Sequence, residues 1–172
     1  MVSLQPQVIV ISGLPGVGKS TAARQLALRF DRAAHVEADR LQDLVVAGAA
    51  LPGSEGIDSQ AREQLDLRLK NACVLARSFV EAGFTAIIDD IVIGSGVEDL
   101  TRHLDGVPFT FVMLLPDFDH VKQRWINIDS PFADRWDWID DEIRNNTERI
   151  GHWLDTTALD PALTVDRILE LL

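Results

Sequence analysis

The sequence predicts an α/β fold built round a parallel β-sheet. Short apolar runs alternate with segments of helical periodicity along the 172 residues, and this alternation is the order expected of a parallel sheet. Polar residues follow several of the apolar runs, at the strand ends where ligands sit in such sheets. The length is near the usual size of one domain, and the chain shows no repeat or linker. We therefore expect a single domain over residues 1–172.

The first predicted strand covers residues 7–12, because it holds an unbroken Val-Ile-Val-Ile run of the kind buried in parallel sheets. An amphipathic helix follows the glycine-rich segment after it. A short second strand is predicted at residues 35–38, and a helix at residues 40–47. Glycines and a proline then break the pattern, which makes residues 48–59 a candidate substrate loop.

A long helix is predicted over residues 60–82, since its apolar residues recur at helical spacing along one stripe. Gly83 suits the position just past its end. The single cysteine, Cys73, excludes an internal disulfide, and we expect it to be a buried structural thiol rather than a nucleophile. The stripe consists of Leu65, Leu69, Ala72, Cys73, Ala76, Phe79 and Val80.

The rest of the chain predicts three more strands and one more helix. The strands are expected at residues 84–88, 109–115 and 152–155, each an apolar run followed by polar or turn-forming residues. The last helix is expected at residues 161–172, where a proline stands at the first position.

Residues 13–21, GLPGVGKST, match the phosphate-binding loop pattern G-x-x-x-x-G-K-[ST] at every fixed position. In such a loop, backbone N–H groups and the start of the next helix surround the phosphates. Lys19 is expected to reach the β- and γ-phosphates, and the Ser20 hydroxyl to hold Mg²⁺. The sequence thus predicts ATP binding by Gly13, Leu14, Pro15, Gly16, Val17, Gly18, Lys19, Ser20 and Thr21.

Three aspartates follow predicted strands at the ligand-binding edge of the sheet. A strand-end carboxylate is needed near Mg²⁺, and we assign Asp89 to the metal and Asp90 to catalysis, although the sequence alone leaves open which of the two faces the metal. Asp39 is the candidate base that orients or deprotonates an acceptor hydroxyl. Its alternative role is to cap the helix that begins beside it.

Positive charge gathers between Leu115 and Trp153, in Lys122, Arg124, Arg135, Arg144 and Arg149. We interpret residues 124–138 as a lid, in which Arg124 contacts the nucleotide and Arg135 acts on the transferred phosphoryl group. We expect Arg144 and Arg149 to pair with neighbouring acidic residues on a solvated helix. The four tryptophans are interpreted as core or lid packing, and the four histidines show no metal-ligand spacing.

The net charge of −11 argues against a nucleic acid or an acidic membrane as partner. Residues 1–6 lack the basic and apolar parts of a signal peptide, and no apolar stretch is long enough to span a membrane. We therefore expect a cytoplasmic protein.

Three segments, GLPGVGKST, HVEADRL and AIIDDIVIGSG, together resemble the small P-loop kinases, a group that includes chloramphenicol phosphotransferase and the gluconate and shikimate kinases. The resemblance implies a three-layer sandwich with a five-stranded parallel sheet in the order 2-3-1-4-5, helices on both faces and a lid. It also implies ATP and Mg²⁺ as cofactors, with Asp39 as base and Arg124 and Arg135 acting from the lid. Residues 48–59 form a shorter segment than the antibiotic kinase's substrate segment, which argues against chloramphenicol itself as the acceptor.

The expected activity is transfer of the γ-phosphoryl group of ATP to a hydroxyl of a small molecule, an antibiotic being one option. A carboxylate-bearing acceptor would need an arginine, and Arg40, Arg62 and Arg68 are the candidates. One alternative is a kinase of polynucleotide or nucleoside 5′-hydroxyls, which the acidic net charge disfavours. Another is a nucleotide-binding regulatory module without phosphotransfer.

Overall fold

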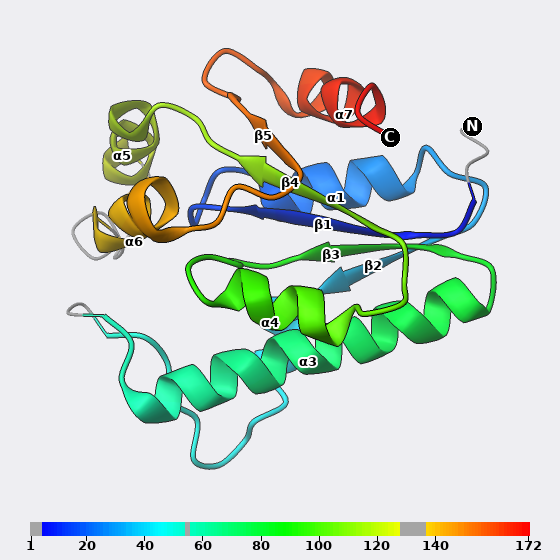
Figure 1. Ribbon diagram of the computed structural model, residues 1–172. Helices are drawn as coiled ribbons and strands as arrows, with labels where there is room; N and C mark the ends of the chain where they lie inside the picture. The colour runs from blue at the N-terminus through cyan, green and yellow to red at the C-terminus, as the bar shows by residue number, and fades with distance from the viewer. Residues whose placement is uncertain (1–4, 54–55, 128–136) are drawn as a thin grey trace.

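The structure is a computed structural model that describes residues 5–53, 56–127 and 137–172, with the backbone alone at 123–127 and 137. It contains a five-stranded parallel sheet in the order β2-β3-β1-β4-β5 (Figure 1). The expected sheet, with its strand order, is therefore confirmed. The strands are β1 (Val8–Gly13), β2 (Ala33–Glu37), β3 (Thr85–Asp89), β4 (Phe109–Leu114) and β5 (His152–Leu154).

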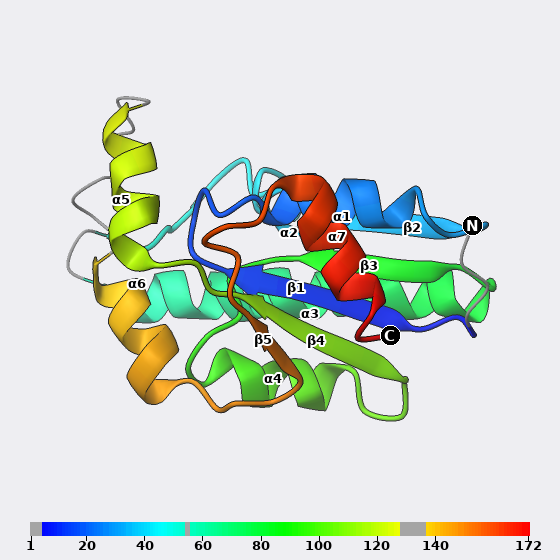
Figure 2. The same ribbon diagram turned by 90° about the horizontal axis from the view of Figure 1, so that it is seen from above.

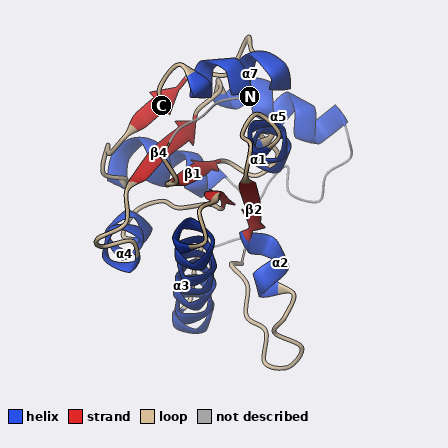
Figure 3. Cartoon of the chain, turned by 90° about the vertical axis from the view of Figure 1, so that its right-hand side faces the viewer, coloured by secondary structure: helices blue, strands red, loops and turns tan. Residues whose placement is uncertain are grey.

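Helices cover both faces of the sheet, as Figures 1 and 3 show. One face carries α3 (Ser59–Glu81) and α4 (Gly96–His103), and the other carries α1 (Lys19–Ala27) and α7 (Pro161–Leu169). Because successive side chains of a strand point to opposite faces, β1 contributes to two apolar clusters. Val8 and Val10 pack under α3, whereas Ile9 and Ile11 pack under α1 and α7.

The second helix, α2 (Ala38–Gln42), differs most from the sequence-based expectation of residues 40–47. It begins earlier and ends five residues sooner. The two apolar residues that extended the predicted pattern, Leu44 and Val46, are 72% and 95% exposed, so no packing supports a longer helix there. The last helix likewise ends at Leu169 instead of residue 172, and α4 was not predicted at all.

Three helical segments lie at the end of the sheet toward which the strands point, as Figures 1 and 2 show. They are α5 (Phe118–Asn127), α6 (Asp137–Asp141) and a π-helix, η1 (Glu142–Asn146). The predicted lid at 124–138 falls on the end of α5, on residues 128–136 and on the start of α6. Residues 128–136, with Arg135, lie outside the described residues.

Two arginines beyond this region behave differently from each other. Arg144 donates to both carboxylate oxygens of Asp140, at 2.9 and 2.8 Å, so its predicted pairing on a helix is confirmed. Arg149 instead stacks over the ring of Trp153, with its guanidinium carbon 4.6 Å from the ring centroid. The prediction that Arg149 pairs with an acidic neighbour was wrong.

No helix in the described part of the chain is long and apolar enough to cross a membrane.

Candidate active site

The phosphate-binding loop joins β1 to α1 at the carboxyl edge of the sheet (Figure 1). Gly13 permits the loop to pass close to β4, because a Cβ there would meet the backbone oxygen of Leu114 at 2.5 Å. Gly18 begins α1 with φ of 97°, a conformation that favours glycine. The loop therefore carries no side chain at Gly13 and Gly18, which leaves room for phosphate oxygens to approach the backbone N–H groups.

A cavity of about 360 Å³ lies over this loop. Lys19 stands in its wall, and its Nζ donates to the backbone oxygen of Leu14 at 3.0 Å. Burial lowers the pKa of Lys19, and the three nearby carboxylates counteract this only in part. The ammonium group is thus short of negative partners, as expected of a group whose partner is a phosphate. Besides the loop, the cavity is lined by Asp39, Asp89, Asp90 and Ile91.

Asp89 ends β3 and is 3% exposed. Burial alone would raise its pKa, but the His35 and Ser20 side chains and the Lys19 charge outweigh burial and lower that pKa. His35 Nε2 lies 3.4 Å from Asp89 Oδ2. Asp89 is therefore ionised at neutral pH, close to the Ser20 hydroxyl, and these two groups are an oxygen pair of the kind that Mg²⁺ takes together with phosphate oxygens.

The described residues contain no cluster of three or more histidine, cysteine or acidic side chains that could hold a metal. A nucleotide-bound Mg²⁺ keeps several waters and needs few protein ligands. Ser20 and Asp89 are the residues that could hold it.

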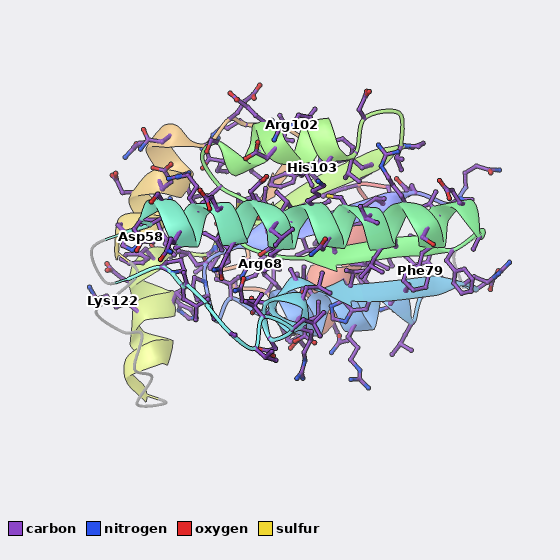
Figure 4. All side chains as sticks on the ribbon, turned by 90° about the horizontal axis from the view of Figure 1, so that it is seen from below. Asp58, Arg68, Phe79, Arg102, His103 and Lys122 are labelled. Carbon is purple, nitrogen blue, oxygen red and sulfur yellow. The ribbon has the colours of Figure 1, made fainter. Side chains whose placement is uncertain are left out.

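Asp90, the next residue, belongs to a chain of three charged side chains. Arg68 of α3 donates to Asp90 Oδ1 at 2.5 Å through Nη2 and to Asp39 Oδ1 at 3.3 Å through Nη1. The Ile91 N–H also donates to Asp90 Oδ1, at 2.7 Å. Burial raises the pKa of Asp90, and Arg68 and the Ile91 N–H counteract this only in part. Figure 4 shows Arg68 along α3 between Asp58 and Phe79.

Asp39 is the exposed member of this chain, with 83% of its side chain accessible. It lies in the first turn of α2, whereas the cap position is Glu37 and makes no side-chain cap bond. The alternative role of Asp39 as the helix cap is therefore wrong. Its carboxylate lines both the phosphate cavity and a second cavity next to it.

The second cavity has a volume of about 480 Å³ and shares Pro15, Asp39 and Ile91 with the first. The polar part of its lining consists of Asp39, Gln42, Asp43 and Arg68. The apolar part comes from the phosphate-binding loop, the loop before α3, α3 itself, the segment after β3, and α6. It consists of Pro15, Leu51, Pro52, Ile57, Leu65, Ile91, Ile93, Trp138 and Ile139.

A third, smaller cavity of about 90 Å³ lies on the opposite side of the phosphate loop, between the start of α1 and the segment after β5. The Asp155 side chain accepts from the N–H and the hydroxyl of Thr157, and Thr157 accepts from the Asp117 N–H at 2.7 Å. These bonds fix the segment that borders the cavity. The position suits the base of a nucleotide whose phosphates lie over the loop.

The structure brings most of the predicted site together. Residues 13–21, Asp39, Asp89 and Asp90 meet at one edge of the sheet. Arg124 lies in α5, where the backbone alone is described, and Arg135 lies outside the described residues. Burial and the nearby Asp90 raise the pKa of Cys73 to about 12, which confirms that it is a buried, unreactive thiol.

Sequence reasoning missed the contacts of two residues next to the site, His35 and Arg68. His35 was given no role, yet its Nε2 lies 3.4 Å from the Asp89 carboxylate. Arg68 was considered for an acceptor carboxylate, and it is tied to the protein's own carboxylates instead. A signal for Arg68 was available, because it falls on the buried stripe of α3 between Leu65 and Leu69, and a buried arginine requires anionic partners.

The comparisons with known proteins agree with this geometry. A profile of the AAA_33 family, described as an AAA domain, matches residues 8–127. Among curated proteins, none matches the sequence. Solved structures share the fold at low identity, and the three described next are matched over nearly the whole chain.

The similar structures include a sugar kinase from Janibacter sp. HTCC2649, 18% identical, with 96% of this chain and 94% of that chain covered at a TM-score of 0.70. An APS kinase from Mycobacterium tuberculosis, solved with AMPPNP and APS, is 15% identical, with 97% of each chain covered and a TM-score of 0.69. A gluconokinase from Sinorhizobium meliloti 1021 is 16% identical, with 96% and 91% covered and a TM-score of 0.68.

The fold is therefore that of the small P-loop kinases, as the resemblance of the sequence implied. Since the matched profile extends over well more than half of the chain, the protein belongs to the AAA_33 family of AAA domains.

Proposed function

We propose that this protein is an ATP-dependent kinase that transfers the γ-phosphoryl group to a hydroxyl of a small molecule. The observation that carries the proposal is the position of Asp39, which lines both the phosphate cavity and the second cavity. We call this second cavity the acceptor pocket. A general base must reach the acceptor hydroxyl while that hydroxyl faces the γ-phosphorus. The shared wall of the two cavities is the place where this can happen.

On the donor side, the loop N–H groups and Lys19 bind the β- and γ-phosphates, with Ser20 and Asp89 holding the metal. Mg²⁺ supplies neutralisation of the charge that develops on the phosphate oxygens. The lowered pKa of Lys19 and the ionised Asp89 support these two assignments. Burial of both groups keeps them oriented before the nucleotide arrives.

On the acceptor side, the hydroxyl oxygen forms the new bond to the γ-phosphorus while the bond from that phosphorus to the bridging oxygen of ADP breaks. The hydroxyl proton passes to the Asp39 carboxylate. Asp90 acts indirectly, because it binds Arg68, and Arg68 in turn positions Asp39 through the 3.3 Å hydrogen bond described above. The products are ADP and a phosphate monoester.

The lid assignment enters this mechanism as a proposal as well. Arg135 would bring a guanidinium group to the transferring phosphoryl group, and Arg124 would contact the nucleotide. Arg124 lies in α5, and Arg135 lies between α5 and α6 in the sequence. Both helices stand at the end of the sheet toward which the strands point (Figure 2), and Trp138 and Ile139 of α6 line the acceptor pocket. The similar structures are named as kinases, which supports phosphotransfer. Their names point to different acceptors, so the acceptor of this protein must be inferred from the residues of its own pocket.

The test is acceptor-dependent release of ADP from ATP and Mg²⁺. A panel of hydroxylated antibiotics, sugars, sugar acids and nucleosides is offered, together with an oligonucleotide carrying a 5′-hydroxyl. We expect release with at least one small molecule and none with the oligonucleotide. Nucleotide binding without release for any compound would support a regulatory module instead, and release with the oligonucleotide alone would support a polynucleotide kinase.

A further inference from the structure

We propose that the acceptor pocket selects an uncharged or cationic acceptor with an apolar body and rejects anionic acceptors. This inference rests on the proposed function, because it concerns the second substrate of the same site. It follows from the charges that line the pocket, the engagement of its arginine and the nature of the remaining walls.

The described residues that line the pocket include three charged side chains, Asp39, Asp43 and Arg68. Two negative charges therefore face one positive charge. Arg68 is also bound to Asp90, which adds a third carboxylate behind it. An anionic acceptor would enter a site that is already negative, and like charges brought together in a partly desolvated site repel strongly.

Arg68 is the only arginine among the described lining residues of this pocket, and its guanidinium group is already engaged. Its Nη1 and Nη2 donate to Asp39 and Asp90, and the residue is 9% exposed. Its Nε is buried and is the one nitrogen of this guanidinium group without a hydrogen-bond partner in the described part of the chain, so an acceptor carboxylate bound in the usual bidentate way would have to share Nη1 or Nη2 with Asp39 or Asp90. Releasing Asp90 would leave a buried carboxylate unpaired, which is costly.

The other two candidate arginines do not replace it. Arg40 is 75% exposed and pairs with Glu37 at 3.3 Å on the surface of α2. Arg62 donates to the Ser95 hydroxyl at 3.3 Å and lines an adjoining cavity of about 110 Å³, which shares Leu65 and Arg68 with the acceptor pocket and is also lined by Asp66, Asp90 and Asp99. Neither lines the acceptor pocket.

The remaining walls favour an apolar body. Leu51, Ile57, Leu65, Ile93 and Trp138 all line the pocket. Its volume of about 480 Å³ falls among pockets of roughly 300–1,000 Å³ that take drug-sized ligands. A small, fully hydroxylated acceptor would leave these walls unfilled, so a compound with an aromatic or aliphatic body and at least one hydroxyl fits better.

The test uses three probes of nearly equal shape that differ in charge. They are 4-(hydroxymethyl)benzamide, 4-(hydroxymethyl)benzoate and 4-(aminomethyl)benzyl alcohol, with sorbitol as a neutral probe that lacks an apolar body. Dissociation constants for the whole chain are measured by NMR titration in the presence of Mg²⁺ and a non-hydrolysable ATP analogue. We expect the dissociation constants of the benzamide and the amine to be lower than that of the benzoate by a factor of about ten or more. Sorbitol should bind weakest or not at all.

A pair of charge-reversal variants connects the result to the pocket. Asp43 lines the pocket and its side chain is exposed, so Asp43→Lys should fold normally. We expect it to tighten benzoate binding about fivefold or more and to weaken amine binding by a similar factor. Asp31→Lys is the matched control, because exposed Asp31 precedes β2 at the opposite end of the sheet, and it should change neither.

The outcomes separate this inference from the proposed function. Benzoate binding as tight as benzamide binding, no binding of any aromatic probe, or equal effects of the two lysine variants overturns the inference. Binding in the expected order without release of ADP for any compound in the acceptor panel leaves the charge selection standing and removes the kinase proposal. Release of ADP with an anionic acceptor alone overturns the inference and keeps the kinase.

Discussion

Arg68 donates a 2.5 Å hydrogen bond to Asp90, and the two side chains are 9% and 3% exposed. The pair connects the middle of α3 to the end of β3 beneath the candidate site. Breaking a buried ion pair by removing one partner is strongly destabilising, because the other charge stays buried and unpaired. The same pair also holds the arginine that contacts Asp39, so we expect a change in the pair to affect both the stability and the proposed catalysis.

Arg68→Met should therefore lower the free energy of unfolding by about 3–5 kcal/mol. Asp90→Asn should cost somewhat less, since an amide can still accept from the arginine. In a double-mutant cycle, the combined variant should lose clearly less than the sum of the two single losses. The measurement is urea unfolding followed by circular dichroism, and additive losses would show that the pair contributes no coupling energy.

The positions of the strands were well predicted from sequence because β1 and β3 are buried on both faces and appear as unbroken apolar runs. The phosphate loop was equally clear, since its glycines and Lys19 have fixed spacing. The contact of Arg68 with Asp90 was not predictable, because it depends on how α3 is rotated against β3. The length of α2 was missed because the exposed Leu44 and Val46 imitate an amphipathic pattern. The length of α7 was missed because Leu172 packs against the core, as a helical residue would, although it lies beyond the end of the helix.

The pKa of Lys19 gives the nucleotide affinity an expected pH dependence. Burial lowers this pKa in the free protein, and bound phosphates require the charged ammonium group. Affinity for a non-hydrolysable ATP analogue should be constant near neutral pH and should fall as the pH rises through the Lys19 pKa. In the free protein this pKa lies below the ordinary lysine value of 10.5. The chain has no tyrosine and the thiol pKa is about 12, so few other groups titrate in this range.

Lys19→Met is the control for that measurement. It should bind the analogue far more weakly and show no such fall with pH. Since burial disfavours the charged lysine in the free protein, the variant should unfold at the same temperature or higher. A lower melting temperature together with unchanged affinity would contradict the assignment of Lys19 to the phosphates.

Asp39→Asn should lower kcat by about 10²- to 10⁴-fold, as expected for the loss of a general base. The affinity for nucleotide should change little, because the proposed role of Asp39 concerns the acceptor hydroxyl and not the phosphates. Its side chain is 83% exposed and caps no helix, so the melting temperature should stay close to that of the parent protein. The kinetics are measured with the best acceptor of the panel. A destabilised variant with normal kcat would return Asp39 to a structural role.

Asp89→Asn should raise the Mg²⁺ concentration needed for half-maximal nucleotide binding, because the amide lacks the charge that holds the metal. Asp31→Asn, an exposed change at the opposite end of the sheet, should leave it unchanged. The stability of the free protein supplies a second, metal-independent measurement. Since the folded pKa of Asp89 is lowered, its contribution is present above the ordinary carboxyl pKa of 3.8 and is lost as the pH falls through the folded value.

The melting temperatures of the parent protein and Asp89→Asn, measured in EDTA from pH 6 to pH 2.5, should therefore converge toward the acid end. His35→Gln should reproduce part of this convergence, because His35 lies 3.4 Å from the carboxylate and helps to lower its pKa. A difference between parent and Asp89→Asn that stays constant with pH would mean that the charge of Asp89 adds nothing to the fold. An unchanged Mg²⁺ requirement would transfer the metal assignment to Asp90, whose carboxylate lines the same cavity.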